Sequence, residues 1–481
     1  MNMEKNIKKS LFIDGEWVES ISKQTKGVEN PATGQVFCEI SYGGPDDAIA
    51  AVNAADRAFA SWSSTSVRER SNILNRVAVL LRERTDEIAK ILATESGKPV
   101  AQAMGEIKFS AEYFQWFAEE IRRPSGQTIP GDVPNKRHHF YSQPAGVALC
   151  LTPWNFPVSI QARKVAPALA AGCTVVARGS DAAPLSVIEL FKCLQDAGIP
   201  KGVANLVQGP ASSTTEAMMK QPAVRVVSFT GSTPVGKAIM RQAADQMQHL
   251  ALELGGNAPF IVFEDADIEK AVEGAMIAKF RNNGQSCIGA NRFYVHEKVY
   301  DQFAKLFAQK ISAMVIGDPV KDANIDLGPM INQKGKNKIE QLISEAVSLG
   351  ATYLVPKREV PVAGYYVPPV ILENVPETCA FAAEELFAPA SPLFKFRDEA
   401  EVIRKANNTD VGLSSYVYTK DVARATRVTE ALKYGIVGLN TGLPVVAFTP
   451  MGGMKQSGLG REGGRYGIEE FMEVKHVAMD L

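Results

Sequence analysis

The chain has 481 residues, more than a single hydrophobic core usually organises, so we expect two or more domains. Hydrophobic residues make up 46% and charged residues 22% of the sequence, which is typical of globular proteins and excludes a disordered chain. The 52 basic and 53 acidic side chains balance, so no overall charge favours binding to nucleic acid or to an anionic membrane.

Targeting and metal signals are missing from the sequence. No apolar run approaches the roughly 18 residues of a membrane span, and the polar start MNMEKNIKKS lacks the apolar core of a secretory signal. We therefore expect a cytoplasmic protein without a membrane partner. The six cysteines are scattered without paired spacing and form no cluster with histidines, so we expect neither a disulfide framework nor a metal site.

Helices are expected first along the chain. Between about residues 68 and 122, apolar residues recur at the spacing of amphipathic helices, in NILNRVAVLLRERTDEIAKILA and AEYFQWFAEEI. From residue 145, short apolar runs alternate with helices of about a dozen residues. The runs are GVALCLTP, CTVVAR, GVANLVQG and AVRVVSFTG. This alternation predicts a doubly wound domain with a parallel sheet covered on both faces.

A second series of the same kind starts near residue 251, with LELGG and APFIVF, and extends to about residue 440. It predicts a second α/β domain. The chain then becomes rich in glycine, in PMGGMKQSGLGREGGRYG. It ends in EEFMEVKHVAMDL, whose alternating apolar residues suit an added strand.

Two motifs lie where predicted strands end. FTGSTPVG, residues 229–236, follows a strand and precedes a helix, an arrangement that can hold a pyrophosphate. Its spacing departs from the dinucleotide fingerprint, so a structural turn and a phosphate site both remain open. Asn155, in PWNFP, is either the cap of a rigid turn or an amide donor placed where negative charge develops.

Two more residues could carry chemistry. Cys287 lies in FRNNGQSCIGANR among small and polar neighbours, unlike a cysteine that packs as a small hydrophobe. Glu253 ends an apolar run in ELGG, where a solvated surface glutamate is the ordinary interpretation. In combination the motifs suggest one reaction: a thiolate adds to a carbonyl, an amide steadies the oxyanion, a nicotinamide takes a hydride, and a carboxylate activates water against the thioester.

Six motifs carry a resemblance to a known family. GQSC, LELGG, PWNFP, FTGSTPVG, EELFAP and GMKQSGLGRE occur in the order of the aldehyde dehydrogenase superfamily, and the resemblance covers about residues 12 to 481. It implies an α/β fold with a modified Rossmann cofactor domain, an α/β catalytic domain and a small bridging region, assembled as a homodimer or homotetramer. The implied boundaries are 1–119 and 146–250 for the cofactor domain, 251–440 for the catalytic domain, and 120–145 and 462–481 for the bridging region.

The resemblance also implies roles for single residues. Cys287 corresponds to the nucleophile and Glu253 to the general base, while Asn155 and the backbone amide of Cys287 correspond to the oxyanion donors. Lys164 and Glu462 correspond to positions thought to assist proton movement. The positions that correspond to those lining the nicotinamide cofactor are Trp154, Arg178, Asp181, Gly231, Ser232, Leu254, Glu385 and Phe387.

The chain departs from the family near the cofactor. The family usually has Lys-Pro where this chain has Arg178 and Gly179. Asp181 lies where an acidic residue commonly binds the ribose hydroxyls, and an acid there repels the 2′-phosphate of NADP. We therefore expect NAD, although Arg178, a good phosphate ligand, leaves NADP open.

Within the superfamily, GNAPFIVFEDADIEKAVEGAMIAKFRNNGQSC resembles the succinate-semialdehyde dehydrogenases most. In that group two arginines hold the distant carboxylate of the substrate, and they correspond to Arg163 and Arg281; structural ion pairs are the alternative. The group often has a third, serine contact where this chain has Val445 and Val446. Glutarate semialdehyde, a sulfonated aldehyde or a neutral aldehyde therefore stays open beside succinate semialdehyde.

Two other functions have to be weighed. One is a non-catalytic binding protein that keeps this fold, and the other is an enzyme that passes the thioester to coenzyme A. Loss of Cys287 or Glu253 would favour one of them, and both residues are present. The sequence therefore predicts NAD(P)-dependent oxidation of a small aldehyde, with a carboxylated semialdehyde as the expected substrate and the free acid as the product.

Overall fold

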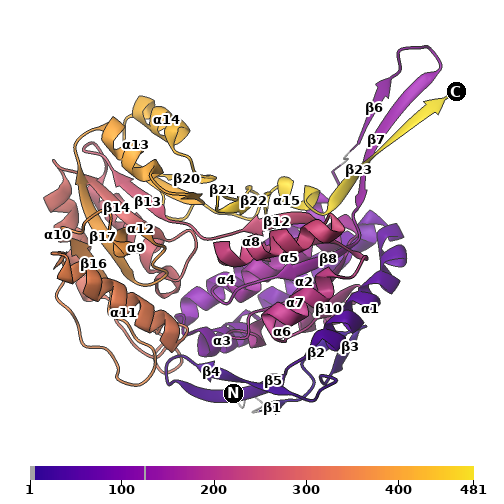
Figure 1. Cartoon of the computed structure of the whole chain (residues 1–481), viewed down its shortest axis with the longest axis horizontal. Helices are drawn as coiled ribbons and strands as arrows, with labels where there is room; N and C mark the ends of the chain where they lie inside the picture. The colour runs from indigo at the N-terminus through magenta and orange to yellow at the C-terminus, as the bar shows by residue number, and fades with distance from the viewer. Residues whose placement is uncertain (1–5, 124–125) are drawn as a thin grey trace.

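The computed structural model describes residues 6–123 and 126–481. Residues 1–5 and 124–125, which fall in the predicted cofactor domain and bridging region, lie outside the described residues. Two large, mostly parallel sheets organise the described chain, one in its first half and one in its second, and a small antiparallel sheet projects from the body (Figure 1).

The predicted helical region is confirmed. It forms three helices, of which the first starts at Ser66, whose side chain accepts a hydrogen bond from the backbone N–H of Glu69. A further helix and a small sheet precede this region. The helices are α1 (Pro45–Ser64), α2 (Val67–Glu83), α3 (Thr85–Ser96) and α4 (Val100–Glu120), and the small sheet contains β1 (Asn6–Ile7), β4 (Thr25–Asn30) and β5 (Gln35–Ser41).

The first large sheet is the predicted doubly wound sheet. Its strand order is β22-β12-β11-β8-β9-β10-β2-β3, and the five strands from β12 to β10 are parallel. Ala148 and Cys150 pack toward α2–α6, while Val147 and Leu149 pack toward α1, α7 and α8, so both faces are buried. The bounds are β2 (Leu11–Ile13), β3 (Glu16–Val18), β8 (Val147–Leu151), β9 (Thr174–Arg178), β10 (Ala204–Leu206), β11 (Val224–Thr230), β12 (His249–Glu253), β22 (Gly458–Leu459), α5 (Pro157–Ala171), α6 (Leu185–Asp196), α7 (Ala211–Met219), α8 (Thr233–Ala243) and η1 (Ala244–Gln246).

One strand corrects the sequence interpretation. The pattern grouped LELGG with the second series, but β12 pairs with β11, from His249 opposite Val226 to Glu253 opposite Thr230. The reason is that α8 joins β11 to β12 as one more strand–helix–strand unit. The alternation of strands and helices in the sequence therefore continues from one sheet into the next and does not mark the boundary between them. The second sheet begins with β13.

The second sheet organises the second half of the described chain. Its order is β15-β16-β17-β14-β13-β19-β20, parallel except for β15, and its faces pack on α9 and α10 on one side and on α11–α14 on the other. The bounds are β13 (Ala258–Val262), β14 (Ala290–His296), β15 (Thr352–Tyr353), β16 (Val370–Glu373), β17 (Ala390–Phe396), β19 (Ser414–Tyr418), β20 (Ile436–Leu439), α9 (Ile268–Phe280), η2 (Arg281–Gly284), α10 (Tyr300–Ala313), α11 (Gln333–Ser348), α12 (Ala380–Ala383), α13 (Glu399–Asn407) and α14 (Val422–Ala431).

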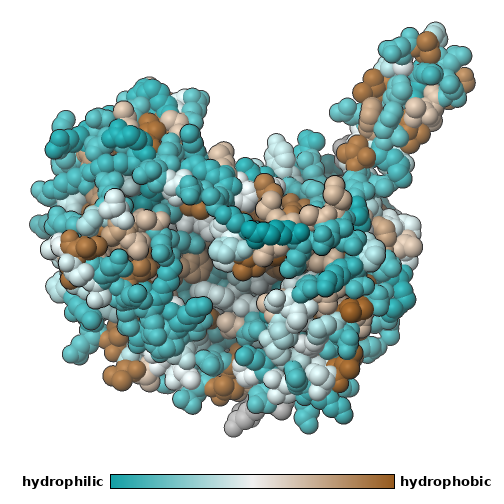
Figure 2. Space-filling model, in the orientation of Figure 1, coloured by the Kyte–Doolittle hydropathy of each residue, from teal (hydrophilic) through white to brown (hydrophobic). Residues whose placement is uncertain are grey.

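The predicted C-terminal strand is confirmed as β23 (Met472–Asp480). With β7 (Lys136–Pro144) and β6 (Gly126–Pro130) it forms the projecting sheet, which we call the arm (Figure 1). Figure 2 shows hydrophobic side chains on the arm, and Ile129 and Val474 are among those exposed. Such a surface suits a contact with a second subunit, which stays a prediction. The remaining elements are β18 (Val411–Gly412), β21 (Met454–Lys455) and α15 (Tyr466–Glu469).

Among the described residues, none of the helices combines the length and the apolarity needed to cross a membrane.

Candidate active site

The loop that carries Cys287 follows α9 through an unusual turn. Asn282, Asn283 and Gly284 have φ of 55°, 57° and 76°, in the left-handed region that asparagine and glycine tolerate best. A Cβ on Gly284 would lie 2.4 Å from the carbonyl of Ala388. The Asn-Asn-Gly sequence therefore reverses the chain between Arg281 and Cys287.

Side-chain hydrogen bonds fix this turn. Asn282 Nδ2 donates to the carbonyls of Asn155 (2.8 Å) and Gln285 (2.9 Å), and Asn283 Nδ2 donates to the carbonyl of Gly97 (3.0 Å). Sequence reasoning missed both asparagines as site residues. Their signal was the adjacent Asn-Asn-Gly, which favours left-handed backbone.

Cys287 lies where two cavities meet. It is partly exposed and lines a wide cavity of about 440 Å³ and a narrow cavity of about 220 Å³. Burial raises the pKa of its thiol to about 12, against the opposing charge of Arg163. The thiol therefore needs a base or added positive charge to form the nucleophilic thiolate. Asn155, 3% exposed, shares the narrow cavity with Cys287.

Most of the predicted cofactor residues line the narrow cavity. Helix α8 begins here, and its N-cap, Ser232, caps no backbone N–H with its side chain. The buried hydroxyl of Thr230 has no hydrogen-bond partner within the described residues. Free N–H groups at a helix start and an unused hydroxyl fit the phosphates and hydroxyls of a dinucleotide. The predicted residues in this lining are Trp154, Gly231, Ser232, Leu254, Glu385 and Phe387.

The other two predicted cofactor residues pair with each other. Arg178 ends β9, and its Nη2 lies 2.7 Å from Asp181 Oδ1 and donates to the carbonyl of Gly209 (2.7 Å). Asp181 also accepts from the hydroxyl of Tyr42 (2.7 Å). Neither Arg178 nor Asp181 lines the narrow cavity. Both lie near the sheet edge where β8, β11 and β12 also end, the edge where α/β sheets bind ligands.

Glu253, predicted as the general base, is buried at the end of β12. It is 2% exposed, and neither carboxyl oxygen has a hydrogen-bond partner in the described part of the chain. Burial, and then the charge of Glu462, raise its pKa to about 8. Glu253 lines neither of the two cavities in this conformation, so the carboxyl must turn to reach a water beside Cys287.

Glu462 holds two cations of α5. Its carboxylate pairs with Lys164 Nζ and lies 2.5 Å from Arg163 Nε. Burial opposes ionisation, but the charges of Lys164 and Arg163 outweigh it and keep the pKa of Glu462 below its usual range. The structure thus brings together the two residues predicted to assist proton movement.

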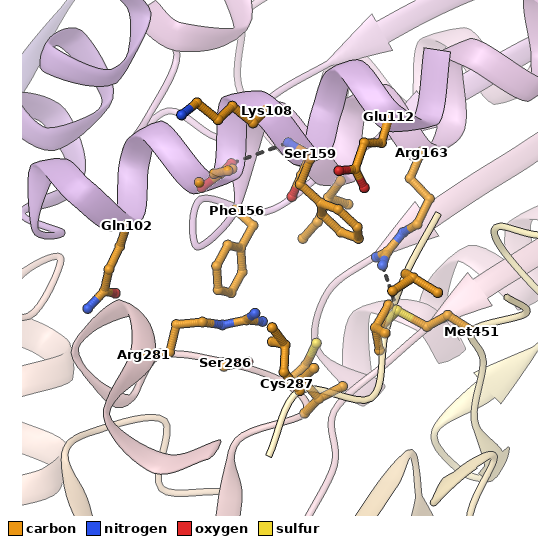
Figure 3. A pocket seen from close by; sticks show the side chains of 18 of the residues that line it. Gln102, Lys108, Glu112, Phe156, Ser159, Arg163, Arg281, Ser286, Cys287 and Met451 are labelled. Atoms are coloured by element: carbon orange, nitrogen blue, oxygen red, sulfur yellow. Dashed lines mark hydrogen bonds between the residues drawn. The ribbon is translucent and has the colours of Figure 1, made fainter. Parts of the chain in front are cut away.

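The two predicted substrate arginines differ in their surroundings. Both line the wide cavity with Cys287. Arg163 is engaged, because it pairs with Glu462 and its Nη1 lies 2.6 Å from Met451 Sδ. Arg281 has no hydrogen bond or ion pair to another described residue, and its guanidinium extends along the cavity toward Cys287 (Figure 3). Burial without an anion lowers the pKa of Arg281.

A buried ion pair that the sequence did not reveal supports the site. Glu106 Oε1 accepts the backbone N–H groups of Val158 (3.0 Å) and Ser159 (3.2 Å) at the start of α5. Lys98 pairs with the other Glu106 oxygen and donates to the carbonyl of Asn155 (2.8 Å). The pair therefore fixes both the Asn155 turn and the helix that carries Arg163. No local signal marks it, because lysine and glutamate side chains are usually solvated.

The chain is similar to known proteins over almost its whole length. The model of the aldehyde dehydrogenase family matches residues 17–477. A glutarate-semialdehyde dehydrogenase of Pseudomonas putida is 45% identical over 98% of both chains, and an Escherichia coli succinate-semialdehyde dehydrogenase named with NADP(+) is 44% identical over the whole of both. A 3-sulfolactaldehyde dehydrogenase of Pseudomonas putida is 45% identical over 98% of this chain and 97% of its own.

Solved structures agree. The crystal structure of an E. coli NADP-dependent enzyme superposes with a TM-score of 0.97 at 44% identity, covering 99% of this chain and 98% of that one. The predicted fold class and enzyme class are thereby confirmed. The chain belongs to the aldehyde dehydrogenase family.

Proposed function

We propose that the enzyme oxidises a small aldehyde carrying a distant anionic group to the free acid, with NAD or NADP. The observation that carries this proposal is Arg281, a guanidinium without an anion partner among the described residues, in the wall of the cavity that holds Cys287. Arg281 is partly buried, and a charge withdrawn from water without a partner is costly unless a ligand compensates it. A carboxylate or sulfonate accepts two parallel hydrogen bonds from such a group.

The proposed reaction assigns one task to each side chain. Cys287 loses its proton and adds as the thiolate to the aldehyde carbon, and Asn155 Nδ2 and the Cys287 backbone N–H donate to the oxyanion of the thiohemiacetal. The narrow cavity, lined by Trp154, Gly231 and Phe387 among others, would hold the nicotinamide, which would accept the hydride. Oxidation leaves a thioester on Cys287, and Glu253 removes a proton from the water that hydrolyses it. The ion pair of Lys164 and Glu462 acts electrostatically on Glu253 and is proposed to assist the movement of the proton that Glu253 removes.

The narrow cavity is the proposed nicotinamide site, and the Arg178–Asp181 pair decides the choice of cofactor. The charge of Arg178 is already balanced by Asp181 at 2.7 Å. Asp181 therefore disfavours a 2′-phosphate, while Arg178 has little charge left to attract one. This arrangement supports a preference for NAD. The E. coli relative is named for NADP, so both cofactors belong in the assay.

The lining of the wide cavity supports an anionic aldehyde as the substrate, but it does not favour one particular length of the substrate's carbon chain. Four cationic side chains (Lys98, Lys108, Arg163 and Arg281) and two anionic ones line it. Val445 and Val446 add an apolar wall without a third polar contact, and about 440 Å³ leaves room beyond a four-carbon substrate. We propose succinate semialdehyde and glutarate semialdehyde as the first candidates, with a sulfonated aldehyde beside them.

The test is a panel of aldehydes. Initial rates with NAD and with NADP give kcat/KM for succinate semialdehyde, glutarate semialdehyde, 3-sulfolactaldehyde and butanal. At least one anionic aldehyde should exceed butanal by about 30-fold or more, the value of one well-placed charged contact. Equal values for butanal and every anionic aldehyde would refute the anionic class and leave a general aldehyde dehydrogenase.

The arm supports assembly into a homo-oligomer. It projects from the body with exposed apolar side chains, among them Ile129 and Val474. Light scattering of the purified protein should give a dimer or tetramer mass, and a variant with Ile129 and Val474 changed to serine should give a smaller one.

A further inference from the structure

The orientation of the Arg281 side chain requires an explanation, because it makes no hydrogen bond or ion pair with another described residue. A long cationic side chain without partners samples many rotamers, and ordering it only when the substrate binds weakens binding. The structure places the ring of Phe156 against it, with the ring centroid 5.0 Å from Arg281 Cζ. Figure 3 shows the ring beside the Arg281 side chain inside the wide cavity.

We propose that Phe156 is a positioning residue that holds Arg281 in its anion-binding orientation through a cation–π contact. This inference rests on the proposed function and adds a residue that determines specificity. The face of an aromatic ring attracts a guanidinium electrostatically but accepts none of its in-plane N–H groups. An acidic partner would hold Arg281 as well, but it would neutralise the charge and compete with the substrate carboxylate. The ring orders the arginine and leaves its charge available.

The surroundings of Phe156 are rigid. Its neighbour Asn155 is held through its carbonyl by Lys98 and Asn282, each at 2.8 Å. On its other side, α5 begins, with the first N–H groups bound by Glu106. Hydrogen bonds therefore fix the backbone immediately before and after Phe156.

The charges around the ring fit this role. Lys98 Nζ lies 4.4 Å from the centroid of the same ring, so two cations share it. Glu106 is the acid of this cluster, and its oxygens are already used by Lys98 and by the start of α5. Glu106 thus balances Lys98 and forms no ion pair with Arg281 in the described part of the chain. The ring remains as the contact that orders Arg281 without a negative charge.

The experiment weakens the ring electrostatically and keeps its shape. Phe156 is replaced in the full-length enzyme by mono-, di- and trifluorophenylalanine, which withdraw charge from the ring face step by step. The KM for the best anionic aldehyde should rise along the series, to about 2- to 30-fold, the range of cation–π contacts at partly exposed to desolvated sites. Its kcat, and the kcat/KM of butanal, should stay within about twofold, because the hydride-transfer geometry is unchanged.

The Arg281→Met background separates the possible failures. There the fluorinated series should have no effect on KM, as a double-mutant cycle requires for a contact between these two residues. If Arg281→Met abolishes the selectivity for anionic aldehydes but fluorination of Phe156 leaves their KM unchanged, the role of Phe156 is overturned and the proposed function stands. A parallel loss with butanal would overturn it as well, since Phe156 would then only shape the pocket. Selectivity unchanged by Arg281→Met would instead refute the proposed function.

Discussion

Replacing Arg281 with methionine should remove the preference for anionic aldehydes and spare neutral ones. Arg281 has no hydrogen bond or ion pair with other described residues, so the substitution breaks no internal ion pair. The substrate carboxylate would instead enter the wide cavity without its counter-charge. Truncating one partner of a buried, hydrogen-bonded charge pair costs about 2–5 kcal/mol, which is about 30- to 5,000-fold in kcat/KM.

The measurement is the ratio of kcat/KM for succinate semialdehyde to that for butanal. Wild type, Arg281→Met and Arg281→Lys are compared, and Lys keeps the charge but loses the planar fork, so its ratio should fall between the other two. Lys305→Met, which removes an exposed positive charge on α10, serves as the charge-matched control and should leave the ratio unchanged. A ratio that is the same in Arg281→Met and wild type would show that the unpaired guanidinium does not bind the substrate.

Further predictions concern four other site residues. Arg163→Met should lower kcat/KM for butanal and for semialdehydes alike, because it removes one of the two cations of Glu462 beside Glu253; a loss confined to anionic substrates would contradict this. Cys287→Ala should abolish turnover while a thermal shift with NAD persists, and residual turnover in folded protein would exclude the covalent route. Glu253→Gln should reduce steady-state turnover by about 10²–10⁴-fold yet keep a burst of reduced cofactor. In wild type, turnover should rise as the pH passes about 8, since a carboxyl with that raised pKa is mostly protonated at pH 7 and acts as a base only above it, whereas Glu253→Gln should show no such rise. Asp181→Ser should raise kcat/KM with NADP relative to kcat/KM with NAD. If the ratio of the two values is unchanged, Asp181 does not determine the choice of cofactor.

The sequence by itself determined several helices and strands, the family, and Cys287 as the candidate nucleophile. Helices over 68–122 and the strands VALCL and TVVAR follow from apolar spacing, which is a local property of the chain. The order of six motifs identified the family, and Cys287 stood out because its neighbours are small and polar. None of these conclusions depends on how distant segments meet.

Tertiary structure alone decided how the charges are balanced. Arg163 and Arg281 look equivalent in the sequence, but the fold brings Glu462 to Arg163 and leaves Arg281 beside the ring of Phe156. In the sequence Lys98 and Glu106 look like ordinary solvated charges, and only the fold brings Lys98, in the loop before α4, and Glu106, on α4, together at the start of α5. The reason is physical: the cost of a buried charge depends on its partners, and Glu462 lies 298 residues from Lys164 along the chain.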